Sequence, residues 1–237
     1  VIEFAPSLIL TEEQRQAICE DALKIARHVN YRSAGTVEFL VDANGNHYFI
    51  EMNPRIQVEH CVTEQITGID IVQAQIRVAQ GYKLADPEIS IPSQESITYR
   101  GYAIQCRVTT EDPANNFAPD TGTIEVYRSS SGHGIRLDSG NAYAGATISP
   151  FYDSLLVKII AYNRTFEGTI DTAIRCLHET KIKGVKTNIG FLINVLNHPR
   201  FRQGQCDTSF IAQTPELFDI HGGDNMEKKM LVFLANK

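Results

Sequence analysis

Hydrophobic and polar residues alternate on both sides of Asn44-Gly45, and this pattern predicts a β-hairpin over residues 36–53. Asn and Gly both tolerate the positive φ that a two-residue hairpin loop requires. With this loop, the expected pairs are Thr36 with Asn53, Glu38 with Glu51 and Leu40 with Phe49. A period of two places these six side chains on one face of the hairpin. The other, core-facing side would hold Val37, Phe39, Val41, Tyr48, Ile50 and Met52.

Apolar residues at helical spacing predict further elements along the chain. Helices are expected over residues 12–29, from Gly68-Ile69-Asp70 to Gly81, over about 166–180 and over about 188–197. The first begins with Thr11-Glu12-Glu13-Gln14, a capping box with acidic residues at the positive end of the helix dipole. Gly81 is expected to cap the second helix at its C-terminus, and Pro199 comes after the last one.

Alternating stretches with few helices between them predict an antiparallel sheet or partial barrel in the middle of the chain. Strands are expected over residues 101–109, 121–128, 134–138 and 154–162. The fold class is therefore α+β, divided at residues 86–96, where two prolines interrupt any helical period. We expect domains over residues 1–85 and 86–220, with the chain beginning inside a domain because Val1 lies in what resembles the end of a strand. Residues 221–237 are expected to form a linker helix towards a following domain or, alternatively, a helix that folds back.

Composition and net charge limit the kinds of molecule that this chain is expected to bind. The chain is 43% hydrophobic and 21% charged, as in globular proteins with a sizeable core. A net charge of −6 argues against broad binding to nucleic acid or to anionic membranes, so any anion site must be local. The five cysteines are widely spaced without a C-x-x-C motif, which predicts reduced thiols in a cytosolic protein. His60-Cys61 is the only adjacent His/Cys pair, and from it we expect a structural hydrogen bond rather than a metal site.

The polar face of the hairpin carries the first candidate chemistry. Two carboxylates that face each other across a strand pair repel unless something positive lies between them. Glu38, Glu51 and the side-chain amide of Asn53 would form an all-oxygen set that suits Mg²⁺ or Mn²⁺ bound together with phosphates. The alternative is a solvated acidic face whose lysine or arginine partners come from elsewhere in the chain.

The residues after the hairpin favour the first of these interpretations. Pro54 ends the strand, and Arg55, Gln57 and Glu59 are expected to alternate outward on a loop that leaves the metal face. A guanidinium can bind an oxyanion in a fork, and a nearby carboxylate can accept a proton. This order of groups suits an anionic substrate.

The string I-E-M-N-P-R-I-Q-V-E-H, residues 50–60, resembles the signature of the ATP-grasp biotin-dependent carboxylases. Carbamoyl-phosphate synthetases share E-x-N-P-R but have S-R-S-S where this chain has Q-V-E-H. The resemblance covers roughly residues 1–220. It implies the back half of an ATP-grasp domain over residues 1–85, succeeded by a mostly antiparallel biotin carboxylase C-terminal domain over 86–220.

The resemblance also implies an activity and a set of site residues. The family binds MgATP (or the Mn²⁺ complex) and bicarbonate, forms carboxyphosphate, and carboxylates N1 of biotin carried on a separate domain. By resemblance, the metal ligands are Glu38, Glu51 and Asn53, and the ATP contacts are Glu38, Leu40 and Glu51. Arg55, Gln57 and Val58 would form the bicarbonate pocket, and Glu59 would be the base. Arg136 would stabilise the enolate of biotin. From the residues alone, Arg136 is instead expected to form a structural ion pair with Asp138 or Glu125.

The match is incomplete in one respect. The Gly-rich loop, the phosphate-binding lysines and the His-x-Lys segment of the family have no counterpart in this sequence, so we expect the chain alone to be inactive. Its implied partners are the N-terminal half of the same domain, biotin carboxyl carrier and carboxyltransferase domains, and further copies of the protein in a homo-oligomer. Neither nucleic acid nor a membrane is an expected partner. The implied location is the cytoplasm, or the mitochondrial matrix in a eukaryote. The alternatives are a non-catalytic assembly module and a subunit of an acyl-CoA carboxylase.

Overall fold

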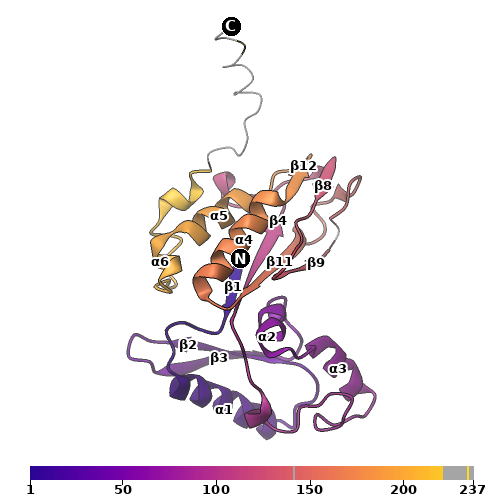
Figure 1. Ribbon diagram of the computed structural model, residues 1–237, viewed down its shortest axis with the longest axis vertical. Helices are drawn as coiled ribbons and strands as arrows, with labels where there is room; N and C mark the ends of the chain where they lie inside the picture. The colour runs from indigo at the N-terminus through magenta and orange to yellow at the C-terminus, as the bar shows by residue number, and fades with distance from the viewer. Residues whose placement is uncertain (141, 221–233, 235–237) are drawn as a thin grey trace. The chain divides into compact units, whose positions relative to one another are not determined.

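The computed structural model describes residues 1–140, 142–220 and Leu234 (Figure 1). Apart from Leu234, the predicted linker helix over 221–237 lies outside these residues. Helices are combined with antiparallel strand pairs, as the α+β prediction requires. The chain divides into two compact units, one of Glu3–Gln105 with Tyr162–Thr169 and one of Val1–Ile2, Cys106–Ala161 and Ile170–Lys237.

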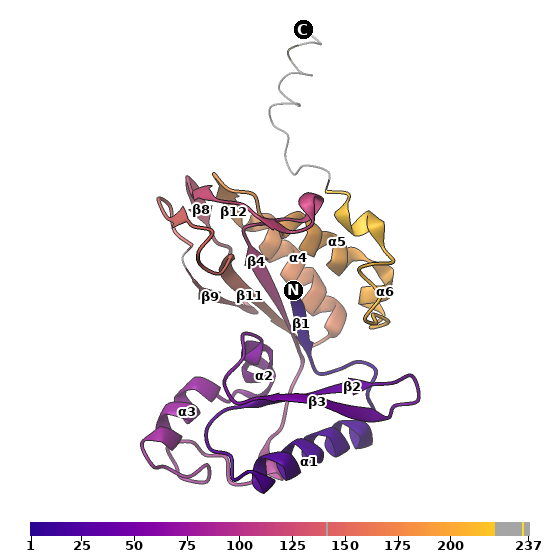
Figure 2. The same cartoon turned by 180° about the vertical axis from the view of Figure 1, so that it is seen from behind.

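The first unit contains helix α1 (Glu12–His28) and the hairpin of β2 (Thr36–Val41) and β3 (His47–Asn53). The predicted capping box is present, since the Thr11 side chain accepts from the backbone of Gln14 and the Gln14 side chain accepts from the backbone of Thr11. Helix α1 runs along the hairpin in both views (Figures 1 and 2). His47 of β3 bonds Asp21 of α1 at 2.7 Å, which ties the helix to the strand.

The hairpin departs from the predicted register. Its pairs agree with the prediction from Thr36–Asn53 to Glu38–Glu51, but a bulge between Glu38 and Phe39 then shifts the partner strand. Phe39 therefore lies opposite Phe49, with their rings 6.3 Å apart, and Leu40 lies opposite Tyr48. The predicted Leu40–Phe49 pair is wrong, and so are the faces predicted for Phe49 and Tyr48.

The physical reason lies at the turn. The hairpin loop holds residues 43–45 rather than two residues, because the Asp42 N–H donates to the carbonyl of Asn46 (2.9 Å). The Asp42 carboxylate accepts from the N–H groups of both Asn44 and Asn46 at 2.9 Å, and Gly45 adopts φ 84°. A three-residue loop that ends in a left-handed glycine changes the pairing by one residue, and a bulge opposite Glu38–Phe39 absorbs that change.

Two helices come after the hairpin. Helix α2 (His60–Thr67) was not predicted, because eight residues show too little of a 3.6-residue period; it ends at Gly68, with φ 72°. Helix α3 (Ile71–Ala79) confirms the second predicted helix, and Asp70 caps it by accepting from the N–H of Gln73 at 2.7 Å. Gln80 rather than Gly81 is its C-cap residue.

A four-stranded sheet has the order β1 (Ile2–Ala5), β4 (Tyr102–Thr109), β11 (Leu155–Asn163) and β9 (Ile135–Ser139). Strands β4 and β11 are nearly continuous buried runs and supply Ile104, Val108 and Ile159 to the core. Helices α4 (Phe166–Glu179) and α5 (Ile189–Asn197) add Ile170, Leu177, Phe191 and Leu192. These strands and helices confirm the elements predicted over 101–109, 134–138, 154–162, 166–180 and 188–197.

Short ladders complete the second unit. The predicted strand over 121–128 consists of two pieces, β7 (Gly122–Thr123) and β8 (Val126–Arg128). They pair with β10 (Thr147–Ile148) and β12 (Lys181–Lys183), and β5 (Glu111–Asp112) pairs with β6 (Ala118–Pro119). The short helical turns of this unit are η2 (Pro113–Asn115), α6 (Pro199–Arg202) and η3 (Pro215–Phe218), and η1 (Gln94–Ser96) lies in the first unit. Within the described residues, every helix is too short or too polar to cross a membrane.

Candidate functional site

The two hairpin carboxylates face each other as predicted, with Glu38 paired to Glu51 directly before the bulge. An amide lies between them: the Asn53 Nδ2 donates to Glu38 Oε1 at 2.9 Å and to Glu51 Oε1 at 3.0 Å. In the part of the chain that the structure describes, no lysine or arginine forms an ion pair with either carboxylate. Within these residues, an amide rather than a cation therefore lies against the two carboxylates, and the choice between a metal site and a solvated acidic face stays a prediction.

Gln57 joins this cluster from the segment after the hairpin. Its Nε2 donates to the same Glu38 Oε1 at 2.9 Å, so one carboxylate oxygen accepts from two side-chain amides. The Gln57 Oε1 is buried and has no hydrogen-bond partner among the described residues. Gln57 thus points back to Glu38, and the expected outward alternation of Arg55, Gln57 and Glu59 fails at Gln57.

The donors at this cluster suit a hard divalent cation. Glu38 is half-buried and Glu51 is exposed, and both present carboxylate oxygens to the space beside Asn53. Turning the Asn53 amide by half a rotation would present its oxygen instead of its nitrogen, which completes an all-oxygen set of the kind that Mg²⁺ and Mn²⁺ prefer. Leu40 lies on the Glu38 face of β2, half-exposed, and the bulge brings Tyr48 opposite it.

The segment from Pro54 to Glu59 connects β3 to α2. A tight turn opens it, in which the Arg55 N–H donates to the Asn53 carbonyl at 2.8 Å. The exposed Arg55 guanidinium donates only to the neighbouring Ile56 carbonyl, at 3.1 Å, among the bonds described. Glu59 occupies the N-cap position of α2, and its carboxylate makes no capping bond there. Arg55 and Glu59 therefore flank Gln57 on a short segment attached to the acidic pair.

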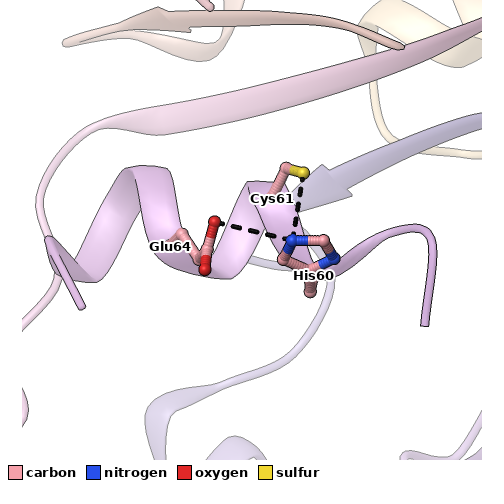
Figure 3. Close-up of side chains that lie close together, drawn as sticks. All are labelled: His60, Cys61 and Glu64. Carbon is pink, nitrogen blue, oxygen red and sulfur yellow. Dashed lines mark hydrogen bonds and ion pairs between the residues drawn. The ribbon is translucent and has the colours of Figure 1, made fainter. Parts of the chain in front are cut away.

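The start of α2 holds a second cluster, of His60, Cys61 and Glu64 (Figure 3). The His60 Nδ1 lies 2.7 Å from the Gln57 carbonyl oxygen, which confirms the structural hydrogen bond expected of this histidine. Its Nε2 lies 3.6 Å from Cys61 Sγ and 3.7 Å from Glu64 Oε2. Glu64 is buried, and its Oε1 accepts from the Ile71 N–H at 2.7 Å. Sequence reasoning missed Glu64, although its spacing four residues after His60 is the signal for a helical pair.

Arg136 belongs to the second unit, on strand β9. Its Nε and Nη2 donate to the two oxygens of Asp138 at 2.9 and 3.0 Å, in the fork geometry of an arginine–carboxylate pair. The buried Lys158 reaches the same Asp138 at 3.2 Å. The ion pair with Asp138 expected from the residues alone is confirmed, and the role of Arg136 towards biotin stays a prediction.

Family comparisons agree with the two halves of the fold. Residues 1–87 match the ATP-binding domain of the carbamoyl-phosphate synthase L chain, and residues 105–213 match the biotin carboxylase C-terminal domain. Among curated proteins, the chain is 56% identical over 236 residues to the pyruvate carboxylase of Bacillus subtilis and 54% identical to that of Schizosaccharomyces pombe. The matches cover 100% of this chain and 20% of each relative, so the chain spans about a fifth of their length.

Solved structures give the same assignment. A Rhizobium etli pyruvate carboxylase with acetyl coenzyme-A superposes with a TM-score of 0.93 at 51% identity, covering 100% of this chain and 24% of that one. The biotin carboxylase domain of a thermophilic 2-oxoglutarate carboxylase bound to bicarbonate gives 0.88 at 46% identity, covering 92% of this chain and 48% of that domain. In sequence and in fold, the whole chain is therefore similar to part of the biotin carboxylase region of pyruvate carboxylases.

Proposed function

We propose that the chain supplies the metal and bicarbonate side of a biotin carboxylase site, which carboxylates biotin at the expense of ATP. The observation that carries this proposal is the hydrogen-bonded group of Glu38, Glu51, Asn53 and Gln57. This group connects an all-oxygen set of possible metal ligands to the segment that carries the Arg55 cation and the Glu59 carboxylate. A related biotin carboxylase domain was crystallised with MgADP and bicarbonate, the ligands that such a group would bind.

Glu38, Glu51 and Asn53 would hold Mg²⁺ or Mn²⁺ beside the ATP phosphates, with Leu40 against the nucleotide. The cation supplies charge neutralisation on those phosphates when bound. The chain's own contribution is rigidity, because both carboxylates stand on paired strands next to a bulge. Such fixed ligands reduce the reorganisation that accompanies phosphoryl transfer.

Bicarbonate would bind at Arg55, Gln57 and Val58. The Arg55 guanidinium suits a planar oxyanion, and Gln57 offers an amide that already lies against Glu38. Glu59 would accept the bicarbonate proton as a bicarbonate oxygen attacks the γ-phosphorus. A new O–P bond forms, the bond from the γ-phosphorus to the bridging oxygen breaks, and ADP leaves with carboxyphosphate as the product of this step.

Arg136 would stabilise the enolate of biotin as the ureido nitrogen N1 loses its proton to the departing phosphate and bonds to the carboxyl carbon of carboxyphosphate. A guanidinium suits this task because the developing charge lies on the carbonyl oxygen of biotin. The bond from that carboxyl carbon to the phosphate oxygen breaks, and inorganic phosphate leaves. The whole protein would then use further domains, a biotin carrier and a carboxyltransferase, to convert pyruvate to oxaloacetate, and would act as a homo-oligomer. The length of the curated relatives, of which the chain covers 20%, supports the presence of such domains.

The test is ATP cleavage by a full-length carboxylase that carries this chain. We expect cleavage to require bicarbonate and biotin together, and omission of either to reduce it to background. Cleavage that continues without bicarbonate would contradict the proposal. Glutamine-driven formation of carbamoyl phosphate would instead favour the carbamoyl-phosphate synthetases, whose ATP-binding domain matches residues 1–87.

A further inference from the structure

We propose that His60 is a positioning residue, which holds the main chain of Gln57 and thereby keeps the segment 54–59 in place beside Glu38. The effect on bicarbonate rests on the proposed function above. The positioning itself is a property of this chain and can be tested without substrates.

The segment 54–59 has little secondary structure of its own, so its conformation depends on a few hydrogen bonds. The Gln57 carbonyl accepts twice from His60, from the backbone N–H at 3.3 Å and from Nδ1 at 2.7 Å. The side-chain bond is the shorter one and lies in a half-buried environment. At its other end Gln57 donates to Glu38 at 2.9 Å. Gln57 is therefore fixed through both its main chain and its side chain.

Chemistry determines which ring nitrogen carries the proton. A carbonyl oxygen can only accept, so the His60 Nδ1 must be the N–H. Nε2 then faces the Cys61 sulfur and the Glu64 carboxylate on the opposite side of the ring (Figure 3). The imidazole thus bridges the segment 54–59 on one side and the body of α2 on the other.

Glu64 lies on the far side of this bridge, with its Oε2 3.7 Å from Nε2. Its side chain is 6% exposed, and its Oε1 receives the Ile71 N–H at 2.7 Å, which belongs to the first residue of α3. Asp70 caps the same helix. The start of α3, Glu64, His60 and Gln57 therefore form a continuous chain of contacts, and the position of Gln57 is coupled to the packing of two helices.

A matched pair of substitutions separates the two nitrogens of His60. Asparagine presents its amide nitrogen near the position of Nδ1, and glutamine presents it near that of Nε2. We expect His60→Asn to keep the bond to the Gln57 carbonyl and His60→Gln to lose it. His28→Gln makes the same change at an exposed histidine at the end of α1 and serves as the control.

The first measurement is amide hydrogen exchange in the 237-residue chain. Over residues 55–62 we expect the amides of His60→Gln to exchange about tenfold faster than those of the unmodified chain, because one hydrogen bond is lost. In His60→Asn and His28→Gln we expect the exchange rates to change by no more than about twofold. Equal acceleration in both His60 variants would indicate a general structural role and overturn the proposal, as would no change in His60→Gln. Ring ¹⁵N NMR of the unmodified chain gives a readout independent of any variant: Nδ1 must carry a proton, and a bare Nδ1 overturns the proposal.

The second measurement uses a full-length carboxylase that carries the chain. We expect the KM for bicarbonate to rise about tenfold in His60→Gln, with kcat and the KM for MgATP within about twofold, and His60→Asn to restore the original KM. If exchange behaves as expected but bicarbonate plays no part in the reaction, the positioning role holds and the proposed function fails. If the reaction depends on bicarbonate but both variants keep its KM, the proposed function holds and the role of His60 in it fails.

Discussion

Asn53 donates from its side-chain amide to Glu38 at 2.9 Å, and the same nitrogen reaches Glu51 at 3.0 Å. A neutral amide thus occupies the place between two facing carboxylates where a cation was expected. The positive end of the amide dipole offsets part of their repulsion.

Asn53→Asp should destabilise the chain when metal is removed. The substitution deletes two hydrogen bonds to carboxylates and adds a third negative charge, and we expect a loss of about 1–3 kcal/mol in the free energy of unfolding. Thermal unfolding in chelator, compared with excess Mn²⁺, measures this loss. Mn²⁺ should raise the melting temperature more in the variant than in the parent, because three carboxylates attract the cation more strongly.

The double variant Glu38→Gln/Asn53→Asp provides the control for this experiment. Because it returns the cluster to two negative charges, its destabilisation in chelator should be smaller than the sum of the single effects. Strict additivity would mean that Asn53 does not act through the Glu38 carboxylate.

Glu59→Gln and Glu51→Gln should fail in different ways in an active carboxylase. Glu59→Gln keeps the size of the side chain but cannot take the bicarbonate proton, so kcat should fall by about 10²- to 10⁴-fold with little change in ATP binding. Glu51→Gln should instead raise the Mn²⁺ concentration needed for half activity. If Glu59→Gln shifts the metal requirement and Glu51→Gln does not, the proposed division of roles is reversed.

The chain alone should bind MgATP weakly. Mg²⁺ usually keeps several waters and relies on substrate phosphates to complete its shell. The sequence offers no Gly-rich loop before a helix to hold those phosphates, and Glu38 is already engaged by two amides. Titration calorimetry should therefore give no dissociation constant in the range of ~1–10 µM. We expect a favourable binding free energy of at most about 4 kcal/mol. A low-micromolar value would identify a complete nucleotide site in these 237 residues.

The ion pair of Asp112 and Lys186 should contribute to stability within a defined pH range. Lys186 lowers the pKa of Asp112 through its hydrogen bond, and Asp112 raises the pKa of Lys186 in the same way. The Asp112 contribution is complete above its unfolded pKa of about 3.9 and is lost as the pH falls through the folded value. The Lys186 contribution is complete below about 10.4 and is lost as the pH rises through the folded value.

Lys186→Met tests this window. The variant should melt slightly below the parent between about pH 5 and pH 9, and the difference should shrink as the pH falls below about 3.9 and through the lowered folded pKa of Asp112. The effect is small because the Lys186 side chain is 66% exposed. Lys181→Met, at an exposed lysine of β12, should match the parent at every pH. A difference that persists at about pH 2 would show that Lys186 acts through packing rather than charge.

The cysteines should differ widely in their reactivity towards a thiol reagent. Cys206 is exposed and should react first, and the half-buried Cys19 should react next. Cys61, Cys106 and Cys176 are buried, and burial also raises the pKa of the Cys176 thiol, so all three should react only after unfolding. Mass spectrometry after labelling at about pH 7, with and without denaturant, measures this order. Rapid labelling of Cys61 in the folded chain would contradict the packing described for α2.

Local hydrogen bonds explain why some features of the fold could be predicted from the sequence. The capping box of Thr11 and Gln14 and the Asp70 cap of α3 are made by residues three positions apart, and their energetics depend little on the remaining chain. The alternating and helical patterns over 101–109, 154–162, 166–180 and 188–197 predicted β4, β11, α4 and α5 close to their observed bounds. The pairing of Glu38 with Glu51 also came from the alternation of the hairpin.

The pattern of residues was enough to predict most of the helices and longer strands, the facing pair of Glu38 and Glu51 and, through residues 50–60, the similarity to biotin-dependent carboxylases. Three features could not be read from the pattern: the loop of three residues, the bulge that pairs Phe49 with Phe39, and the hydrogen bonds from the amides of Asn53 and Gln57 to Glu38. Whether a bulge forms depends on a competition between turn geometry and packing against neighbouring residues, and a short sequence pattern does not predict the outcome. The bond from the Ile71 N–H to the Glu64 carboxylate likewise depends on how α2 and α3 pack together, because it joins residues of two helices at 2.7 Å.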